Sequence, residues 1–150
     1  MERSIPPPPF VGLRDSGAAV LDTAIIANRL ACYVPSLLGY DDGFRLRAIL
    51  HDFGLVWQDA DSTERMVLVA EEPALFDQRW DAFLAAYAEH LCYHAGLDAP
   101  DWTRHDSRYL EQMWWPGDPF EFERGSIILK TPAAFEVHGM WIDERELKVV

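Results

Sequence analysis

The sequence predicts a mainly α-helical fold: a single-domain helical bundle with a small C-terminal β-hairpin or short-strand region. Three observations support this fold class. First, 150 residues with 49% hydrophobic side chains suit one domain around one core. Second, apolar residues recur at intervals of three and four residues as far as residue 97. Third, prolines and tryptophans break this periodicity in the remaining segment, which leaves room only for short elements.

The chain divides into a proline-rich N-terminal arm, residues 1–14, and a mostly helical domain, residues 15–150. The four prolines at residues 6–9 lack the N–H donor of a helix and favour an extended conformation. This arm could bind an aromatic groove of another protein, but we expect it to pack on its own domain. The domain has a helical part, residues 15–97, and a Trp- and Pro-rich irregular part with short strands, residues 98–150.

The first predicted helix spans residues 15–34 and ends where Pro35 cannot continue it. Its side chains are apolar on nearly every face, and one of these faces carries Leu21, Ile25 and Cys32. A helix that is apolar all round is normally buried. We therefore expect this segment to be the central helix of the bundle.

A second helix is predicted from Phe44 to Phe53, with Gly54 as its C-terminal cap. It carries His51 and Asp52, which could form an acid–base pair. Neighbouring residues on a helix point about 100° apart, however. We therefore expect the two side chains to have surface or capping roles and not to act on each other directly.

A third, short helix fits residues 62–72, although part of that segment also has strand propensity. The clearest helix runs from Asp77, a suitable N-cap, to His94, and Gly96 is placed to end it. Its apolar side chains recur at helical spacing and should form one buried stripe that packs on the first helix. That stripe consists of Trp80, Phe83, Leu84, Tyr87 and Leu91.

The C-terminal part is expected to form short elements. Ser126–Lys130 and Met140–Ile142 are predicted strands, which could pair as a hairpin. Between them, Pro132 begins a helix of one or two turns that reaches Val137. Residues 144–148 form a terminal turn.

The chain carries a net charge of −12, and most of the acidity lies in residues 61–150, where eighteen acidic side chains outnumber eight basic ones. Such a field repels phosphate backbones and attracts basic protein surfaces. No signal-peptide pattern is present, no segment is apolar enough to cross a membrane, and Cys32 and Cys92 suit free thiols. We therefore expect a cytoplasmic protein that binds a basic partner protein and neither nucleic acid nor membranes.

His90 and His94 stand four residues apart, a spacing that places both imidazoles on one side of a helix, as a metal pair requires. His105 in the next loop could supply a third ligand, which would suit a small metal-dependent enzyme. The metalloprotease motif is absent, because Glu89 precedes the first histidine instead of following it. The alternative, which we favour, is that both histidines cap the helix end through hydrogen bonds to backbone carbonyls.

The sequence carries no convincing catalytic signature. It lacks a glycine-rich phosphate loop and a Gly-x-Ser-x-Gly elbow. Neither Cys32 nor Cys92 has a base beside it in the sequence, and a catalytic thiol needs one. We therefore predict no catalytic residue and no cofactor, and we favour a non-enzymatic role.

The segment from residue 114 to residue 120 combines aromatic rings, prolines and an acid on an expected irregular loop. Tryptophan is enriched at binding hot spots. We expect one of the two adjacent tryptophans to fill the core and the other to be exposed for recognition. The candidate partner-binding residues are Trp114, Trp115, Asp118, Phe120, Glu121 and Glu123.

Six short motifs in the second half of the chain carry a family resemblance. They are Arg79–Leu84, Ala99–Thr103, Arg108–Leu110, Trp114–Pro116, Lys130–Phe135 and Met140–Asp143. Together they resemble a poorly characterised bacterial family, mainly actinobacterial, whose antitoxin-like members often carry an N-terminal helix-turn-helix and are encoded beside nucleotidyltransferase-like toxins. The resemblance implies an antitoxin or regulatory role. The first sixty residues show no helix-turn-helix, and the resemblance assigns no catalytic residue.

Three functions remain open from the sequence. The favoured one is an antitoxin-like or regulatory protein that binds and restrains a basic partner protein, such as a toxin encoded nearby. The first alternative is a small metal-dependent enzyme built on His90 and His94. The second is a structural or oligomerisation domain, for example one that forms a homodimer.

Overall fold

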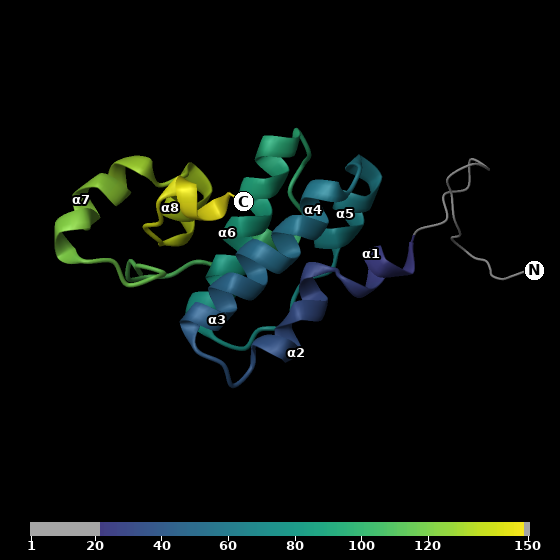
Figure 1. Ribbon diagram of the computed structural model, residues 1–150, viewed down its shortest axis with the longest axis horizontal. Helices are drawn as coiled ribbons and strands as arrows, with labels where there is room; N and C mark the ends of the chain where they lie inside the picture. The colour runs from purple at the N-terminus through teal and green to yellow at the C-terminus, as the bar shows by residue number, and fades with distance from the viewer. Residues whose placement is uncertain (1–21, 149–150) are drawn as a thin grey trace, which may run out of the picture.

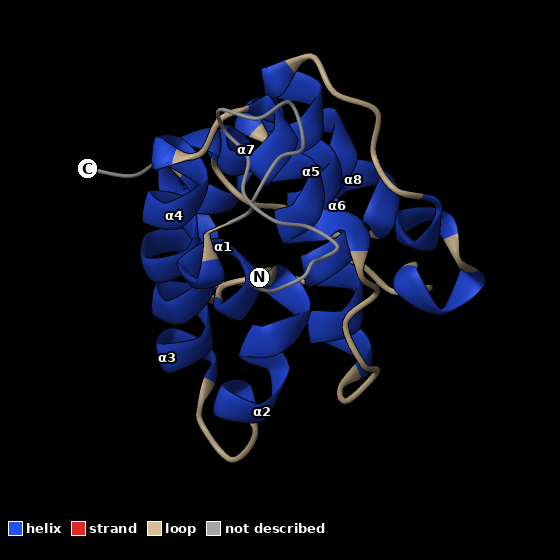
Figure 2. Ribbon diagram, turned by 90° about the vertical axis from the view of Figure 1, so that its right-hand side faces the viewer, coloured by secondary structure: helices blue, strands red, loops and turns tan. Residues whose placement is uncertain are grey.

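The computed structural model describes residues 22–148, and this part of the chain is built from helices joined by loops (Figures 1 and 2). It contains no β-strand, and its β-type pairing is limited to an isolated parallel bridge between Trp114 and Met140. The mainly helical prediction is confirmed, whereas the prediction of a C-terminal β-hairpin is wrong. The proline-rich arm, residues 1–14, and the start of the first predicted helix lie outside the described residues.

Helix α6 (Gln78–Ala95) is the centre of the fold. The carboxylate of its N-cap, Asp77, accepts hydrogen bonds from two backbone amides of the first turn (3.0 and 3.2 Å). Gly96 ends the helix with a left-handed φ of 70°, which glycine adopts without steric cost. The predicted bounds are confirmed. Every residue from 80 to 88 is buried, so α6 has neighbours on all sides instead of along one stripe.

The predicted stripe on α6 is buried at its first four positions, and Leu91 is partly buried at its end. Aromatic contacts connect the stripe to two other elements. The ring of Phe53 lies 6.3 Å from that of Tyr87, and the ring of Phe135 lies 5.3 Å from that of Phe83, measured between centroids. The core is therefore built around α6.

The first predicted helix is wrong in its length. Two short helices, α1 (Thr23–Ala27) and α2 (Val34–Leu37), and a 3-10 turn, η1 (Leu30–Tyr33), stand in its place. The break lies at Arg29, whose backbone is extended (φ −58°, ψ 146°). Pro35 lies in the first turn of α2, where its missing N–H costs no hydrogen bond.

These short segments are not the central helix either. The helix α1 packs mainly on α5 (Ser62–Ala70), whereas the main packing partner of α6 is α8 (Ala133–His138). Ile25 is buried, but Cys32 is exposed, and Leu21 lies outside the described residues. The apolar periodicity is shared by two short helices, whose buried residues are Ile25 in α1 and Val34 and Leu37 in α2.

One continuous helical segment replaces the second predicted helix. It comprises α3 (Asp42–Leu46), a π-helical stretch η2 (Arg47–Phe53) and α4 (Gly54–Asp59). Gly54 keeps a helical φ of −58° and does not cap the helix. The helix continues because Trp57, one turn later, is buried in the same core.

The third prediction, a short helix, is confirmed by α5. Its first turn is a capping box. The carboxylate of Asp61 accepts from the amide of Glu64 (2.8 Å), and the carboxylate of Glu64 accepts from the amide of Asp61 (2.9 Å). These two hydrogen bonds favour the helix over the strand that its apolar run also permits.

The C-terminal part is also helical. It contains the 3-10 turns η3 (Asp101–Arg104) and η4 (Asp106–Arg108), the helices α7 (Glu121–Lys130) and α8, and the 3-10 turn η5 (Glu144–Leu147). The short helix after Pro132 and the terminal turn are confirmed. The predicted strand Ser126–Lys130 is wrong, because it is the second half of α7. Acids in the first turn of α7 and Lys130 in its last turn suit the helix dipole.

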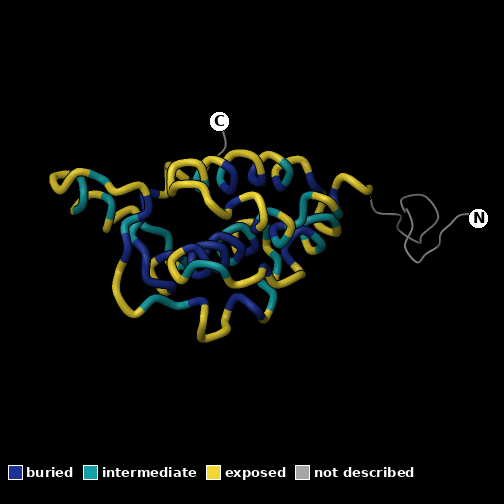
Figure 3. The backbone as a smooth tube through the Cα atoms, turned by 90° about the horizontal axis from the view of Figure 1, so that it is seen from below, coloured by how far each residue is buried: buried dark blue, intermediate teal, exposed yellow. Residues whose placement is uncertain are grey.

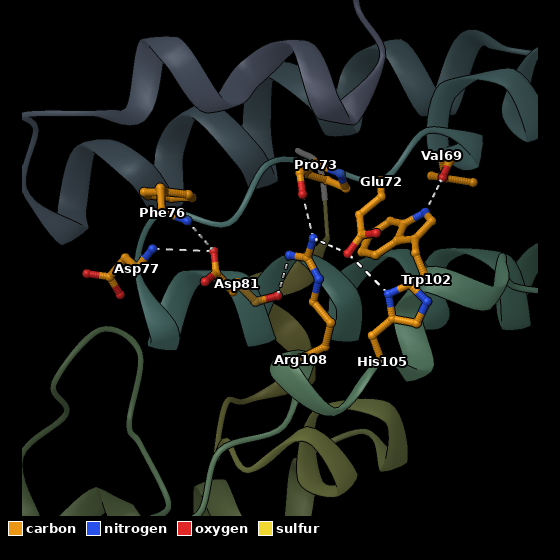
Figure 4. Close-up of polar contacts among 9 residues, drawn as sticks. All are labelled: Val69, Glu72, Pro73, Phe76, Asp77, Asp81, Trp102, His105 and Arg108. Carbon is orange, nitrogen blue, oxygen red and sulfur yellow. Dashed lines mark hydrogen bonds and ion pairs between the residues drawn. The ribbon is translucent and has the colours of Figure 1, made fainter.

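A fully buried arginine, Arg108 of η4, holds the linker between α5 and α6 (Figure 4). Its guanidinium donates to the carbonyl oxygens of Pro73 and Asp81 and to the carboxylate of Glu72 (3.0 Å). It also lies 4.9 Å from the ring centroid of Trp102. A buried charge is tolerated when it is paired and hydrogen-bonded, so Arg108 fixes η4 against the start of α6.

Two neighbouring contacts complete this network (Figure 4). The carboxylate of Asp81 accepts from the backbone amides of Phe76 and Asp77 (2.9 and 3.3 Å). The indole of Trp102 donates to the carbonyl of Val69 (2.8 Å). The linker therefore has a fixed path although it contains no regular secondary structure.

Leu84 is fully buried at the centre of α6. Replacing it by alanine should lower the free energy of unfolding by roughly 2–5 kcal/mol, because the shorter side chain leaves a cavity in the packed core. Leu129 is 86% exposed, so Leu129→Ala is a matched control and should change stability by about 0.5 kcal/mol or less. Chemical denaturation measures both variants. Wild-type stability in Leu84→Ala would contradict the central position of α6.

The ion pair of Glu72 and Arg108 should make the stability depend on pH. Burial alone would raise the pKa of Glu72, but hydrogen bonds from Arg108 and His105 lower it below the ordinary 4.5. A lowered pKa means that the pair stabilises the fold above pH 4.5 and that this contribution is lost as the pH falls through the lowered value.

Urea denaturation of wild type and Glu72→Gln at a series of pH values tests this expectation. The stability advantage of the wild type should be constant at neutral pH and should shrink in acid below the ordinary pKa. An advantage that stays constant throughout the acid range would show that Glu72 does not act through its charge.

Candidate functional site

Residues 115–140 form an excursion from the helical body, and its two ends meet at Trp114. The N–H of Trp114 donates to the carbonyl of Gly139 (2.9 Å), and the N–H of Trp141 donates to the carbonyl of Trp114 (3.0 Å). The ring of Trp114 is buried and lies 5.3 Å from that of Trp80 on α6. The excursion therefore has a fixed base, and Figure 1 shows its helix α7 at one end of the molecule.

The base of the excursion requires glycine at position 139. Gly139 has a φ of 101°, a left-handed conformation that other residues rarely adopt. A Cβ atom at this position would lie 2.8 Å from the Cβ of Leu110. Both the backbone conformation and the lack of space therefore exclude a side chain here.

His138, the last residue of α8, fastens the excursion to α6. Its fully buried ring has Nε2 2.8 Å from the carboxylate of Glu89 and Nδ1 2.7 Å from the carbonyl of Arg108. Both ring nitrogens therefore face an oxygen acceptor. Burial alone would raise the pKa of Glu89, but the hydrogen bond and charge of His138 bring it below its ordinary value.

The helix α7 has no buried residue. Two of its apolar side chains are strongly exposed: Phe122 is 84% exposed and Leu129 is 86% exposed. Their separation of seven residues places them on one side of the helix. Phe120, before the first turn, is 72% exposed and stacks on Phe122 with 5.7 Å between ring centroids. We call Phe120, Phe122 and Leu129 the outer surface of α7. In Figure 3 most of the backbone tube of α7 has the colours of exposed and intermediate residues.

The opposite side of α7 rests on Trp115. The guanidinium of Arg124 lies 4.7 Å from the ring centroid of Trp115, whose ring lies 6.2 Å from that of Trp141. Arg124 also faces the carboxylate of Asp118 at 3.9 Å. Trp115 is half-buried and therefore acts mainly as a support for α7.

An open groove of about 670 Å³ lies beside this support. Its apolar lining includes Leu46 and Leu50 from the α3–η2 helix, Trp141 and Ile127. Charged side chains of both signs stand among the lining residues, which include Arg47, Lys148, Glu123 and Glu146. A groove of this size with mixed walls can accept side chains of another molecule.

The structure divides the six predicted partner-binding residues into four groups. Trp114 belongs to the core, and Trp115 supports α7. Asp118, Phe120 and Glu123 line the groove, and Glu121 is exposed in the first turn of α7. Sequence reasoning missed Phe122 and Leu129, because it treated part of their segment as a strand. Their spacing of seven residues was a signal that could have identified them.

The three predicted metal ligands are not brought together. The rings of His90 and His94 are adjacent, with 4.4 Å between centroids, but His105 pairs with Glu72 instead (3.3 Å). Within residues 22–148, no three His, Cys, Asp or Glu side chains form a potential metal-binding group. Burial, together with the charge of His94, lowers the pKa of His90 to about 4.

The favoured alternative for these histidines is wrong, because neither ring hydrogen-bonds to a backbone carbonyl of the described part. His51 and Asp52 also differ from expectation, since Nδ1 lies 3.0 Å from the carboxylate. The Cα–Cβ directions of adjacent helix residues diverge, but rotation about the side-chain bonds brings this imidazole and this carboxylate together. Burial raises the pKa of the Cys92 thiol to about 11, so this thiol is protonated at neutral pH.

Comparisons with known protein families, curated proteins and solved structures gave no match to this chain. None of the helices within residues 22–148 has both the length and the apolar character that a membrane crossing requires.

Two glycines of the excursion should respond oppositely to alanine. Gly139→Ala should destabilise the protein by roughly 1–3 kcal/mol, because it forces a left-handed backbone and a steric clash. Gly125 lies inside α7 with open space around it, so Gly125→Ala should be neutral or stabilise by about 0.5–1 kcal/mol through helix propensity. Thermal melts compare the two variants. A Gly139→Ala protein as stable as wild type would contradict the closed base of the excursion.

Proposed function

We propose that this protein binds and restrains a partner protein with a basic surface, and that α7 is the helix that docks on that partner. The observation that carries the proposal is the exposure of α7. A ten-residue helix with no buried residue contributes little to its own fold, yet it presents Phe120, Phe122 and Leu129 to solvent.

The outer surface of α7 offers a large gain in free energy on docking. Complete burial of a Phe or Leu side chain contributes about 1.5–3 kcal/mol, so the three side chains together can form a binding hot spot. Side chains at one helix face, spaced by a whole number of turns, suit insertion into an apolar groove of a partner. The helix is already formed and anchored at its base, which reduces the entropic cost of binding.

The charge of the molecule selects the kind of partner. Glu121 and Glu123 lie in the first turn of α7, and Asp118 precedes them. The whole chain has a net charge of −12, so two copies repel each other, whereas a basic protein is attracted and steered toward the site. The charge therefore favours a basic partner over a second copy of the chain.

The groove beside α7 supports the same proposal. Asp118, Phe120 and Glu123 were chosen from the sequence as partner-binding residues, and all three line it. A partner that covers α7 can also place side chains into this groove. The resemblance to antitoxin-like proteins agrees with this role, and it makes a toxin encoded by a neighbouring gene the first partner to test.

The test is co-purification with the product of the neighbouring gene, followed by affinity measurement. Leu129→Asp should weaken the complex by roughly tenfold or more, since a charge enters an apolar contact. Leu75→Asp is the matched control, because Leu75 is an exposed leucine (55%) outside the excursion, and it should bind like wild type. Rising salt should slow association of the wild type.

Three results would overturn the proposal. One is the absence of a complex together with undiminished toxicity of the neighbouring gene product. The second is equal affinity for Leu129→Asp and wild type. The third is a stable homodimer that buries α7, which would support the alternative of an oligomerisation domain.

A further inference from the structure

The chain has five histidines, and all of them lie in the described part. Three of them, His51, His105 and His138, have a carboxylate oxygen within hydrogen-bonding distance. His90 and His94 differ, since neither ring hydrogen-bonds to any residue of the described part. Among residues 22–148, no group therefore engages the ring nitrogens of His90 and His94 through a hydrogen bond.

The two rings also converge. Residues four apart on a helix differ in height by about 6 Å, whereas the ring centroids of His90 and His94 are 4.4 Å apart with an interplanar angle of 63°. Each imidazole therefore leans toward the other. A Zn–N bond is about 2.0–2.1 Å long, so two rings this close can bind one ion.

The helix holds the pair in place. The ring of His90 packs against Phe135 of α8 at 5.9 Å between centroids, and the helix beneath it is the most buried element of the fold. His94 is exposed and His90 is partly buried, so the pair opens to solvent and an ion can reach it. Two neighbouring residues could also act as metal ligands by their chemistry, but Glu89 is paired with His138 and Cys92 is fully buried.

We propose that His90 and His94 form a two-ligand site for a divalent transition-metal ion, namely Zn²⁺, Cu²⁺ or Ni²⁺. Imidazole prefers these ions, whereas Mg²⁺ and Ca²⁺ prefer oxygen ligands. No third chain ligand completes the site within residues 22–148, so the remaining positions on the ion are open to water or to a group from another molecule. The site is independent of the proposed docking helix, because it lies in the last turns of α6.

The site is tested on the full-length chain without a polyhistidine tag, by isothermal titration with Zn²⁺ and, separately, with Ni²⁺. One equivalent of either ion should bind, and Mg²⁺ at the same concentration should not. His94→Ala should weaken binding by roughly tenfold or more, because one imidazole remains. His105→Ala is the matched control: its side chain is also exposed and also bears an imidazole, and it should bind like wild type.

A second measurement locates the ion without relying on affinity. Paramagnetic Ni²⁺ should broaden the NMR signals of residues 90–94 first, and His94→Ala should remove this effect while its melting curve stays that of wild type. The proposal is overturned if the wild type binds neither ion, if His94→Ala binds as tightly as wild type, or if the broadening centres on His51 or His105.

Discussion

The buried guanidinium of Arg108 binds three segments of the chain together, and the positions of the other elements depend on this contact. A charge removed from water must find partners for its donors, and here those partners come from the linker after α5 and from the first turn of α6. Glu72, Pro73 and Asp81 each accept from it, and Trp102 packs against its face. This single group therefore connects the helical half of the chain to the half that follows residue 97. Together with the contact of His138 with Glu89 and the packing of α8 on α6, this connection fixes the C-terminal elements relative to α6.

The same connection explains why α7 is exposed. The backbone carbonyl of Arg108 lies within hydrogen-bonding distance of Nδ1 of His138. The other ring nitrogen, Nε2, lies within hydrogen-bonding distance of the carboxylate of Glu89 on α6. This fixes α8, and Trp114 closes the base of the excursion beside it. Of the residues between these contacts, α8 packs on α6, whereas α7 has no buried residue and keeps its apolar side chains exposed. The proposed docking function builds on this anchoring, since both ends of the segment that carries α7 are hydrogen-bonded to the helical body.

Local signals in the sequence were sufficient for α5 and α6. In α6, an N-cap at Asp77, a helical apolar period and a glycine at 96 agree with one another. The same kind of reasoning failed between residues 15 and 34, because Arg29 breaks the helix in a place that no proline or glycine marks. It failed again at Gly54, where burial of Trp57 keeps the helix intact, and in α7, where two adjacent isoleucines indicated a strand. For the candidate site, the sequence pointed to the acids and Phe120, which lie in or near the groove and α7, whereas it did not point to Phe122 and Leu129.

The sequence by itself determined the helical class, the acidic charge, the bounds of α6 and the pairing of His90 with His94, because each depends on neighbours within one or two helical turns. Tertiary structure alone decided which helix is central, which tryptophan is buried, and that His105 joins Glu72 instead of the histidine pair. It also decided that α7 stays in solvent. These outcomes depend on contacts between residues thirty or more positions apart, such as those of Arg108 with the α5–α6 linker and of His138 with Glu89. No local pattern encodes such contacts, since they form only when the whole chain is packed.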